Sequence, residues 1–281
     1  MPFRSFTKLL PLLLSVSLFT PAIGHSEPSV QAESWILVEG LSSAPLAGHN
    51  VDERRQPASL TKLMTAYVVL EAIKNGQVSW KDVVTVQEDD LRVVADDEAR
   101  MYLTVGQRVQ LKDLVSGLIV ASANDAANVL ARHLAGSTTS FSALMNKTAQ
   151  NLGMTNSHFI TPSGISVPGH YSTAKDLSIL AQRLTAEHPE YYKFSSQKEF
   201  SFRGFSKTSK NKLLGMGIGV DGLKTGHTIA AGWCIVATAQ RQVPSEKSTR
   251  RVFAVLLGEP TAHQRISDAK ELLDFGFKSL K

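Results

Sequence analysis

The sequence has one cysteine, Cys234, among its 281 residues. A single cysteine excludes an internal disulfide framework and a cysteine-based zinc cluster, and the apolar, strand-like surroundings of this one predict inert packing. The eight histidines form no His-Glu-x-x-His motif and no close pair. We therefore expect neither a metal site nor another cofactor. A chain of this length can still bury a sizeable core without such supports.

The chain also lacks a large excess of positive or negative charge. The chain carries 30 lysines and arginines against 25 acids, a formal net charge of +5. This excess is too small and too scattered to indicate nucleic-acid binding, although it suits a protein that meets an anionic surface. The basic stretch at 207–212 has no interleaved aromatic side chains, so we interpret it as a solvated loop.

Long hydrophobic runs are absent except at residues 9–20. Arg4 and Lys8 precede this run, and small residues follow it at a cleavage site, as in a secretory signal peptide. The run is shorter than the roughly 20 apolar residues of a membrane span, so a retained anchor is the weaker alternative. We expect a signal peptide at 1–24 and an exported, periplasmic chain at 25–281.

The remaining composition is that of a folded globular protein, 43% hydrophobic and 20% charged. Apolar, β-prone runs lie near the start, at 35–38, and near the end, at 233–239 and 252–257. Residues 77–200 between them have mostly helical spacing. Strands at both ends of a helical region predict one α+β domain at 25–281, an antiparallel sheet into which the helical region is inserted.

The helix expected at 57–74 has few polar positions and ends at Asn75-Gly76. A helix with so complete an apolar surround is expected to be buried in the middle of the protein. Asp176 is interpreted as the cap of a later helix. The remaining predicted helices are 111–121, 126–135, 141–152, 177–184 and 266–275.

The Ser-Leu-Thr-Lys tetrad at 59–62 places a hydroxyl and an amine one turn apart on the same face of the buried helix. A serine hydroxyl is a weak nucleophile until a base takes its proton. Lys62 can be that base for Ser59 if burial or a second cation lowers its pKa toward neutrality. The tetrad alone carries little weight, because the sequence contains six Ser-x-x-Lys tetrads.

Two further motifs support a catalytic role for the tetrad at 59–62. Ser-Ala-Asn at 122–124 lies between two predicted helices, where the serine can relay a proton and the asparagine amide can bind a peptide; an ordinary helix cap is the alternative. Lys-Thr-Gly at 224–226 precedes the C-terminal strands. On a strand edge it offers a cation, a hydroxyl and a glycine that permits close approach of another backbone; a solvated edge strand protected by lysine is the alternative.

In this order the three motifs match the signature of β-lactamases and penicillin-binding proteins. The segments 57–65, 122–126 and 220–228 look like those of the low-molecular-mass penicillin-binding proteins. From about Trp35 to Phe277 the chain most resembles the serine D-alanyl-D-alanine carboxypeptidases of the S11 peptidase family. The resemblance implies the serine β-lactamase/penicillin-binding-protein fold, with the active site between the sheet and the helical region.

The resemblance also implies catalytic roles for individual residues. Ser59 would form the acyl-enzyme, Lys62 would act as the general base, and Ser122 would pass the proton to the leaving amine. Asn124 and Lys224 would hold the site together and orient the substrate.

On the substrate side, the resemblance implies that the peptide is bound by Lys224, Thr225 and Gly226. The backbone amides of the nucleophile and of His227 would form the oxyanion hole. Arg265, which precedes the last predicted helix, would meet the terminal carboxylate of the substrate.

The implied reaction is removal of the terminal D-alanine from peptidoglycan stem pentapeptides through a serine ester, at a site that β-lactam antibiotics acylate. A D,D-endopeptidase that cuts cross-links with the same machinery is an alternative. A class A β-lactamase is less favoured, because Glu187, Glu190 and Glu199 lack the Glu-x-x-Leu-Asn context of its deacylating glutamate. A non-catalytic cell-wall binding protein is least favoured, because all three motifs are intact.

Two features depart from the family pattern. Many relatives continue into a β-rich domain and an amphipathic membrane helix, and neither is recognisable after Phe277, so we do not expect membrane association by that route. The segment 88–100 is rich in acids and does not resemble the relatives. We interpret it as a solvated loop rather than as a substrate-selecting element.

Overall fold

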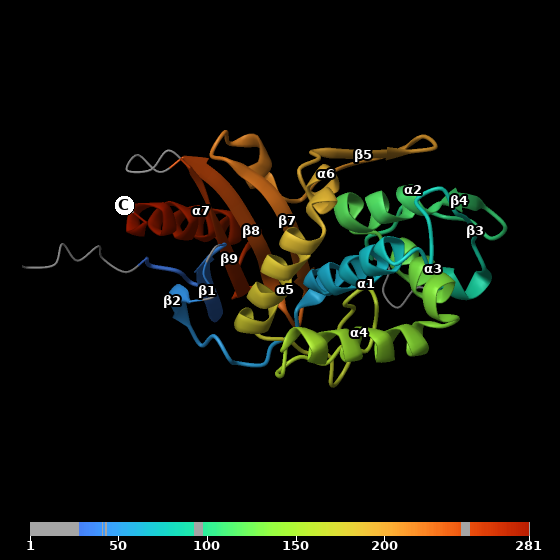
Figure 1. The fold of residues 1–281 in the computed structure, drawn as a ribbon, viewed down its shortest axis with the longest axis horizontal. Helices are drawn as coiled ribbons and strands as arrows, with labels where there is room; N and C mark the ends of the chain where they lie inside the picture. The colour runs from blue at the N-terminus through green and yellow to red at the C-terminus, as the bar shows by residue number, and fades with distance from the viewer. Residues whose placement is uncertain (1–27, 41, 43, 93–97, 243–247, 281) are drawn as a thin grey trace, which may run out of the picture.

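A computed structural model of the chain describes residues 28–40, 42, 44–92, 98–242 and 248–280. The predicted signal peptide lies outside the described residues. Figure 1 shows a β-sheet in the left half of the molecule and a group of helices in the right half.

The sheet consists of β1 (Ser34–Glu39), β2 (Pro45–His49), β7 (Val220–Thr228), β8 (Gly232–Gln242) and β9 (Thr249–Glu259). These strands are antiparallel and lie in the order β2-β1-β9-β8-β7. Strand β1 from the beginning of the chain pairs with β9 from its last part, with Trp35 opposite Leu256. The predicted α+β class, with a sheet formed from both ends of the domain, is therefore confirmed.

The inserted helical region contains α1 (Lys62–Lys74), α2 (Leu111–Ser116), α3 (Asn124–Ala135), α4 (Thr138–Leu152), α5 (Ala174–Glu187) and α6 (Tyr192–Ser195). Short 3-10 or π segments extend it at η1 (Ala58–Thr61), η2 (Glu88–Leu91), η3 (Gly117–Ala121), η4 (Pro189–Tyr191) and η5 (Lys212–Gly215). The helix predicted at 111–121 is thus α2 continued by a π segment. Two small antiparallel sheets of two strands each, which the sequence did not predict, pair β3 (Val83–Thr85) with β4 (Arg108–Gln110) and β5 (Glu199–Phe202) with β6 (Phe205–Thr208).

Helix α1 lies at the centre of the helical region, as its apolar surround predicts. It packs against α3, α4 and α5, and Leu63, Met64 and Leu70 are completely buried. The η1 turn that precedes it contacts β7 and β8. The beginning of α1 therefore lies at the junction between the sheet and the helical region.

Helix α7 (Ala262–Ser279) covers the face of the sheet that is turned away from the helical region. Its residues Leu272, Leu273 and Phe277 pack with apolar side chains of β1, β8 and β9, in a core separate from the one around α1. The predicted last helix therefore packs on the sheet as expected. Among the helices of the described residues, none combines the length and apolar character needed to cross a membrane.

Two residues singled out from the sequence have structural roles. Cys234 is completely buried in β8, and burial raises the pKa of its thiol to about 11, which agrees with inert packing. The interpretation of Asp176 as a helix cap is wrong, because Thr173 Oγ1 accepts the 3.0 Å hydrogen bond from the Asp176 amide. The Asp176 carboxylate instead accepts hydrogen bonds from the Asn156 amide and the Ser157 hydroxyl, which tie a preceding loop to α5.

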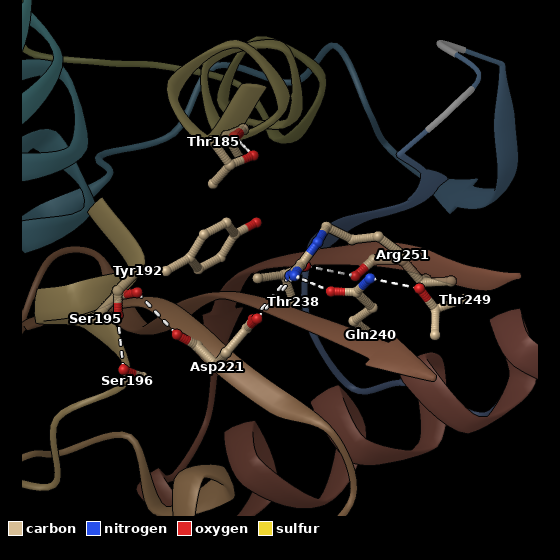
Figure 2. Close-up of polar contacts among 11 residues, drawn as sticks. Thr185, Tyr192, Ser195, Ser196, Asp221, Thr238, Gln240, Thr249 and Arg251 are labelled. Carbon is tan, nitrogen blue, oxygen red and sulfur yellow. Dashed lines mark hydrogen bonds and ion pairs between the residues drawn. The ribbon is translucent and has the colours of Figure 1, made fainter. Parts of the chain in front are cut away.

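Strand β7 is an edge of the sheet, and Arg251 of β9 holds its first residues in place (Figure 2). The Arg251 guanidinium reaches across β8 and makes two 2.8 Å contacts with the Asp221 carboxylate. It also donates to Thr238 Oγ1 at 3.1 Å and lies 4.4 Å from the centre of the Tyr192 ring. The Ser195 hydroxyl donates to the Asp221 carbonyl oxygen at 2.8 Å. These contacts fix the start of β7 relative to both the sheet and α6.

Candidate active site

The Ser-x-x-Lys tetrad lies where η1 runs into α1. Lys62 Nζ is 2.9 Å from Ser59 Oγ, as the helical spacing predicts. Lys62 is completely buried, whereas Ser59 is partly exposed. Burial is the main cause that lowers the pKa of Lys62 to about 7. A substantial fraction of the amine is therefore neutral near pH 7 and can accept the Ser59 proton.

Two further acceptors hold the Lys62 amine beside the hydroxyl. Asn124 Oδ1 and the Ser163 carbonyl oxygen each lie 2.7 Å from Lys62 Nζ. Because these acceptors come from separate elements, the amine is fixed in position before any substrate binds.

A neighbouring loop packs tightly against the turn that presents Ser59. Ala58 has a φ of 48°, in the left-handed region that non-glycine residues seldom occupy. Gly164 also has a positive φ, and a Cβ at this position would lie 1.9 Å from the Ala58 carbonyl oxygen. Glycine is therefore required at 164 for both conformation and space. This requirement was not predicted, because a serine-glycine pair in a loop has no distinctive sequence pattern.

The Ser-Ala-Asn motif connects the two lysines of the site. Ser122 follows η3 with a φ of 61°, and its Oγ accepts a 2.9 Å hydrogen bond from Lys224 Nζ. Asn124 begins α3 and accepts from Lys62. Ala123 occupies the cap position of α3 without a side-chain cap. The alternative of an ordinary helix cap is therefore wrong.

The Lys-Thr-Gly motif lies on β7 with its side chains buried. Lys224 is 4% exposed, so the alternative of a solvated edge lysine is also wrong. Burial, and then repulsion from Lys62, lowers the pKa of Lys224 well below its usual value. A Cβ on Gly226 would come within 3.1 Å of the Ser59 amide nitrogen. Glycine therefore allows β7 to approach the backbone of Ser59.

His227 and Arg265 lie at the end of β7. His227 is exposed, and its ring stacks on Trp233 with 3.8 Å between ring centres. Arg265 is 3% exposed, and one of its guanidinium nitrogens donates to the Gly226 carbonyl oxygen at 3.3 Å. Burial lowers the pKa of Arg265 to about 10, so it remains a cation near neutral pH. A buried cation at this place favours an anionic group of a ligand.

One cavity of about 340 Å³ brings the predicted residues together between β7 and the helical region. Lys62 and Lys224 do not line it, but each donates a hydrogen bond to a residue that does. The predicted residues that line it are Ser59, Ser122, Asn124, Thr225, Gly226, His227 and Arg265. All nine candidate residues therefore belong to one site.

The acidic segment 88–100 is not simply a solvated loop, and that interpretation is wrong at two described positions. Asp90 is 2% exposed and pairs with Arg132 at 2.8 Å. Glu98 lines the cavity and accepts a 2.8 Å hydrogen bond from Asn124 Nδ2. The sequence does not distinguish these two carboxylates from the other acids of the segment, because their partners lie 26 or more residues further along the chain. The middle of the segment lies outside the described residues.

The stretch 207–212, interpreted as a solvated loop, is solvated at Lys210 and Lys212 but is not a loop throughout. The stretch begins in β6 and ends in η5. Lys210 between them is exposed and lines the cavity. The other residues that line the cavity come from distant parts of the chain, so no local sequence pattern indicated that Lys210 lies there.

A separate cluster outside the cavity deserves comparison with a metal site. Ligand atoms of Glu71, Glu187 and His188 lie within 4.8 Å of one another. Glu187, however, already accepts a hydrogen bond from Tyr67 and pairs with Arg183, while His188 Nε2 lies 2.9 Å from Glu71. These protein contacts account for the cluster as a polar link between α1 and the end of α5.

Comparison with known proteins agrees with this geometry. Residues 22–261 match the D-alanyl-D-alanine carboxypeptidase family, peptidase S11. The chain is 38% identical to a D-alanyl-D-alanine carboxypeptidase of Haemophilus influenzae over 95% of this chain and 67% of the relative. It is 39% identical to one of Escherichia coli over 93% of this chain and 66% of the relative. The chain thus spans about two thirds of the length of these relatives.

Solved structures of other proteins are also similar to this chain in fold and sequence. Penicillin binding protein 5 from Haemophilus influenzae has a TM-score of 0.86 at 38% identity, covering 91% of this chain and 73% of that one. Penicillin-binding protein D2 from Listeria monocytogenes, in its ampicillin-bound form, has a TM-score of 0.78 at 35% identity, covering 88% of this chain and 98% of that one. The predicted fold and family are therefore confirmed, and the chain belongs to the S11 family of D-alanyl-D-alanine carboxypeptidases.

Proposed function

We propose that this chain removes the terminal D-alanine from peptidoglycan stem pentapeptides through an acyl-enzyme on Ser59. One observation carries the proposal: a buried lysine with a pKa lowered to about 7 contacts a partly exposed serine at the base of a cavity. This is the arrangement that converts a hydroxyl into a nucleophile without a metal or another cofactor. The family to which the chain belongs supports the same reaction.

In acylation, Ser59 Oγ attacks the carbonyl carbon of the penultimate D-alanine while its proton moves to Lys62 Nζ. The backbone amides of Ser59 and His227 stabilise the oxyanion. The carbon–nitrogen bond then breaks, and the leaving amine takes a proton from Ser122. Lys62 then passes its proton to Ser122, which restores that hydroxyl and leaves the amine of Lys62 neutral again.

In deacylation, a water molecule attacks the ester carbonyl and gives a proton to Lys62. The ester bond breaks, and Lys62 returns that proton to Ser59 Oγ. The same base therefore serves both half-reactions, and its protonation state controls both.

The β7 side of the cavity supports recognition of a terminal carboxylate. On this side Lys224 supplies a buried amine and Arg265 a buried guanidinium cation, the Thr225 hydroxyl lies on a residue that lines the cavity, and Gly226 allows the substrate backbone to approach. Asn124 orients the peptide from the opposite side. β-Lactams meet the same serine, which agrees with the ampicillin-bound form of the related Listeria structure.

D,D-endopeptidase activity is the alternative that the same machinery supports. The class A β-lactamase alternative gains no support, because Glu187, Glu190 and Glu199 do not line the cavity. Mass analysis of the products from a pentapeptide and from a cross-linked muropeptide dimer separates the two peptidase activities. We expect release of D-alanine from the pentapeptide; cleavage of the dimer alone would replace the carboxypeptidase proposal by the endopeptidase.

Fluorescent penicillin tests the alternative of a non-catalytic binding protein. The purified chain should form a covalent penicilloyl adduct of one per molecule. Failure of the wild-type chain to label would overturn the proposed function.

We also propose export through a signal peptide at 1–24 and a periplasmic location for a single catalytic domain at 25–281. The n-region, apolar run and cleavage site described above support this proposal. Fractionation of cells that express the full gene product should place the chain in the periplasm. Recovery in the membrane pellet, with release by detergent but not by salt, would indicate a retained anchor instead.

A further inference from the structure

Glu98 belongs to the acidic segment that departs from the family pattern, yet it lines the same cavity as Ser59. It forms one end of a hydrogen-bonded series: Glu98 Oε2 accepts from Asn124 Nδ2 at 2.8 Å, and Asn124 Oδ1 accepts from Lys62 Nζ at 2.7 Å. Lys62 in turn contacts Ser59. We propose that Glu98 is a positioning residue that orients the Asn124 amide and keeps a negative charge beside the general base. The inference rests on the proposed function, because it assigns Lys62 the role of that base.

The orientation of the Asn124 amide matters, because its two ends have opposite polarity. The oxygen must face Lys62, since a reversed amide would direct its NH₂ group at the lysine amine, which is a donor when protonated. A carboxylate accepts hydrogen bonds and cannot donate one when ionised. Glu98 therefore favours the orientation in which the NH₂ group faces the segment and the oxygen faces Lys62.

The charge of Glu98 also opposes the other influences on Lys62. Burial lowers the pKa of Lys62 most strongly, Lys207 and Lys210 lower it further, and Glu98 is the leading influence that raises it. Lys224 also belongs to the network, because its amine donates to Ser122, and burial together with Lys62 lowers its own pKa.

Asp125 also raises the pKa of Lys62, but by less than Glu98. Its carboxylate is occupied by hydrogen bonds from the backbone amides of Met101 and Leu103. Glu98 thus keeps the pKa of the general base, Lys62, near neutral pH, where a base is most effective. Without its charge, the amine would lose its proton at lower pH and would be a weaker base.

The test measures the second-order rate constant of acylation by fluorescent penicillin from about pH 5 to about pH 9. Glu98→Gln removes the charge and keeps an acceptor oxygen, so we expect the acid limb of the profile to move to lower pH by about 0.5 to 1 unit. Glu98→Asp keeps the charge, so its limb should stay near the wild-type position even if the plateau falls. Glu88→Gln is the matched control in the same acidic segment, and its profile should superimpose on that of the wild type.

A second variant tests the charge effect from the opposite side. Lys210→Gln removes a cation that lowers the pKa of Lys62, so its acid limb should move to higher pH. Opposite shifts in Glu98→Gln and Lys210→Gln would support the proposal even if one variant were less stable. A Glu98→Gln limb that coincides with the wild type, or moves upward, would overturn it. That result would leave the proposed function intact, whereas absence of acylation in the wild type would refute the function itself.

Discussion

The buried polar residues of the motifs and two charged residues of the cavity wall are held in different ways. Lys62, Lys224 and Ser122 are buried; Lys62 contacts Ser59 and Asn124, and Lys224 donates to Ser122. Glu98 and Lys210 line the cavity and come from segments without any recognisable motif. The buried group must satisfy every donor and acceptor, which restricts its residues to a few types at fixed spacing. Glu98 and Lys210 are more exposed, so a substitution there can change the electrostatics of the site without rebuilding its buried part.

The largest effect is expected from removal of the proposed nucleophile, Ser59, which lines the cavity. Ser59→Ala should abolish penicillin acylation, a loss of at least about 10⁴-fold, while the melting temperature stays near that of the wild type. The label is quantified by mass spectrometry of the intact protein. Ser267→Ala is the control, because it changes an exposed serine of another Ser-x-x-Lys tetrad. A penicilloyl adduct on Ser59→Ala would mean that a different serine is the nucleophile.

Replacement of the base should be nearly as damaging. Lys62→Arg keeps a cation that does not lose its proton, so acylation near pH 7 should fall by about 10² to 10⁴-fold. In the wild type, acylation should rise as the pH increases through about 7, because the protonated amine cannot accept the Ser59 proton and its pKa is lowered to about 7.

The exposed Lys74 lies in the same helix, and Lys74→Arg should leave this profile unchanged. Unimpaired acylation by Lys62→Arg near neutral pH would contradict the base role.

The close approach at Gly164 is expected to give the next effect. Gly164→Ala places a methyl group against the Ala58 carbonyl oxygen, so we expect a loss of about 2 to 4 kcal/mol in the free energy of unfolding and slower acylation. Gly136 also has a positive φ but has open space around it, so Gly136→Ala should cost only about 1 to 2 kcal/mol. Denaturant titration compares the two. Equal losses would show that the backbone conformation, and not the contact with Ala58, requires glycine at 164.

The smallest effect is expected at the anchor of β7, outside the cavity. Arg251→Ala removes both contacts with Asp221, so it should lower the free energy of unfolding by about 1.5 to 3 kcal/mol and slow acylation by about 3 to 10-fold. Arg183 forms a partly exposed ion pair on α5, and Arg183→Ala should change acylation little. An Arg251→Ala enzyme with wild-type acylation would show that β7 keeps its position without this anchor.

The sequence predicted the buried half of the site because that half is encoded locally. Ser59 and Lys62 share one helical turn, and their spacing alone places their side chains together. The predicted sheet and central helix follow from apolar patterns of the same local kind. Glu98 and Gly164 escaped prediction because their roles depend on partners brought close only by the fold: Asn124 for one and Ala58 for the other. The β3–β4 and β5–β6 strand pairs escaped prediction because such short strands carry too few residues for a period-two pattern.

The pairing of β1 with β9 joins segments more than 200 residues apart. Contacts of such long range close slowly during folding, because the chain must first lose the entropy of the large loop between them. Strands β7 and β8 can form their hairpin early, but they reach β1 only through β9, which lies between them in the sheet. A chain whose synthesis or export stops before β9 would therefore hold all three motifs and still lack the continuous sheet that connects β7 to β1. Catalytic competence should consequently appear in one late step of folding, and penicillin labelling during refolding would report the moment at which the two ends of the domain meet.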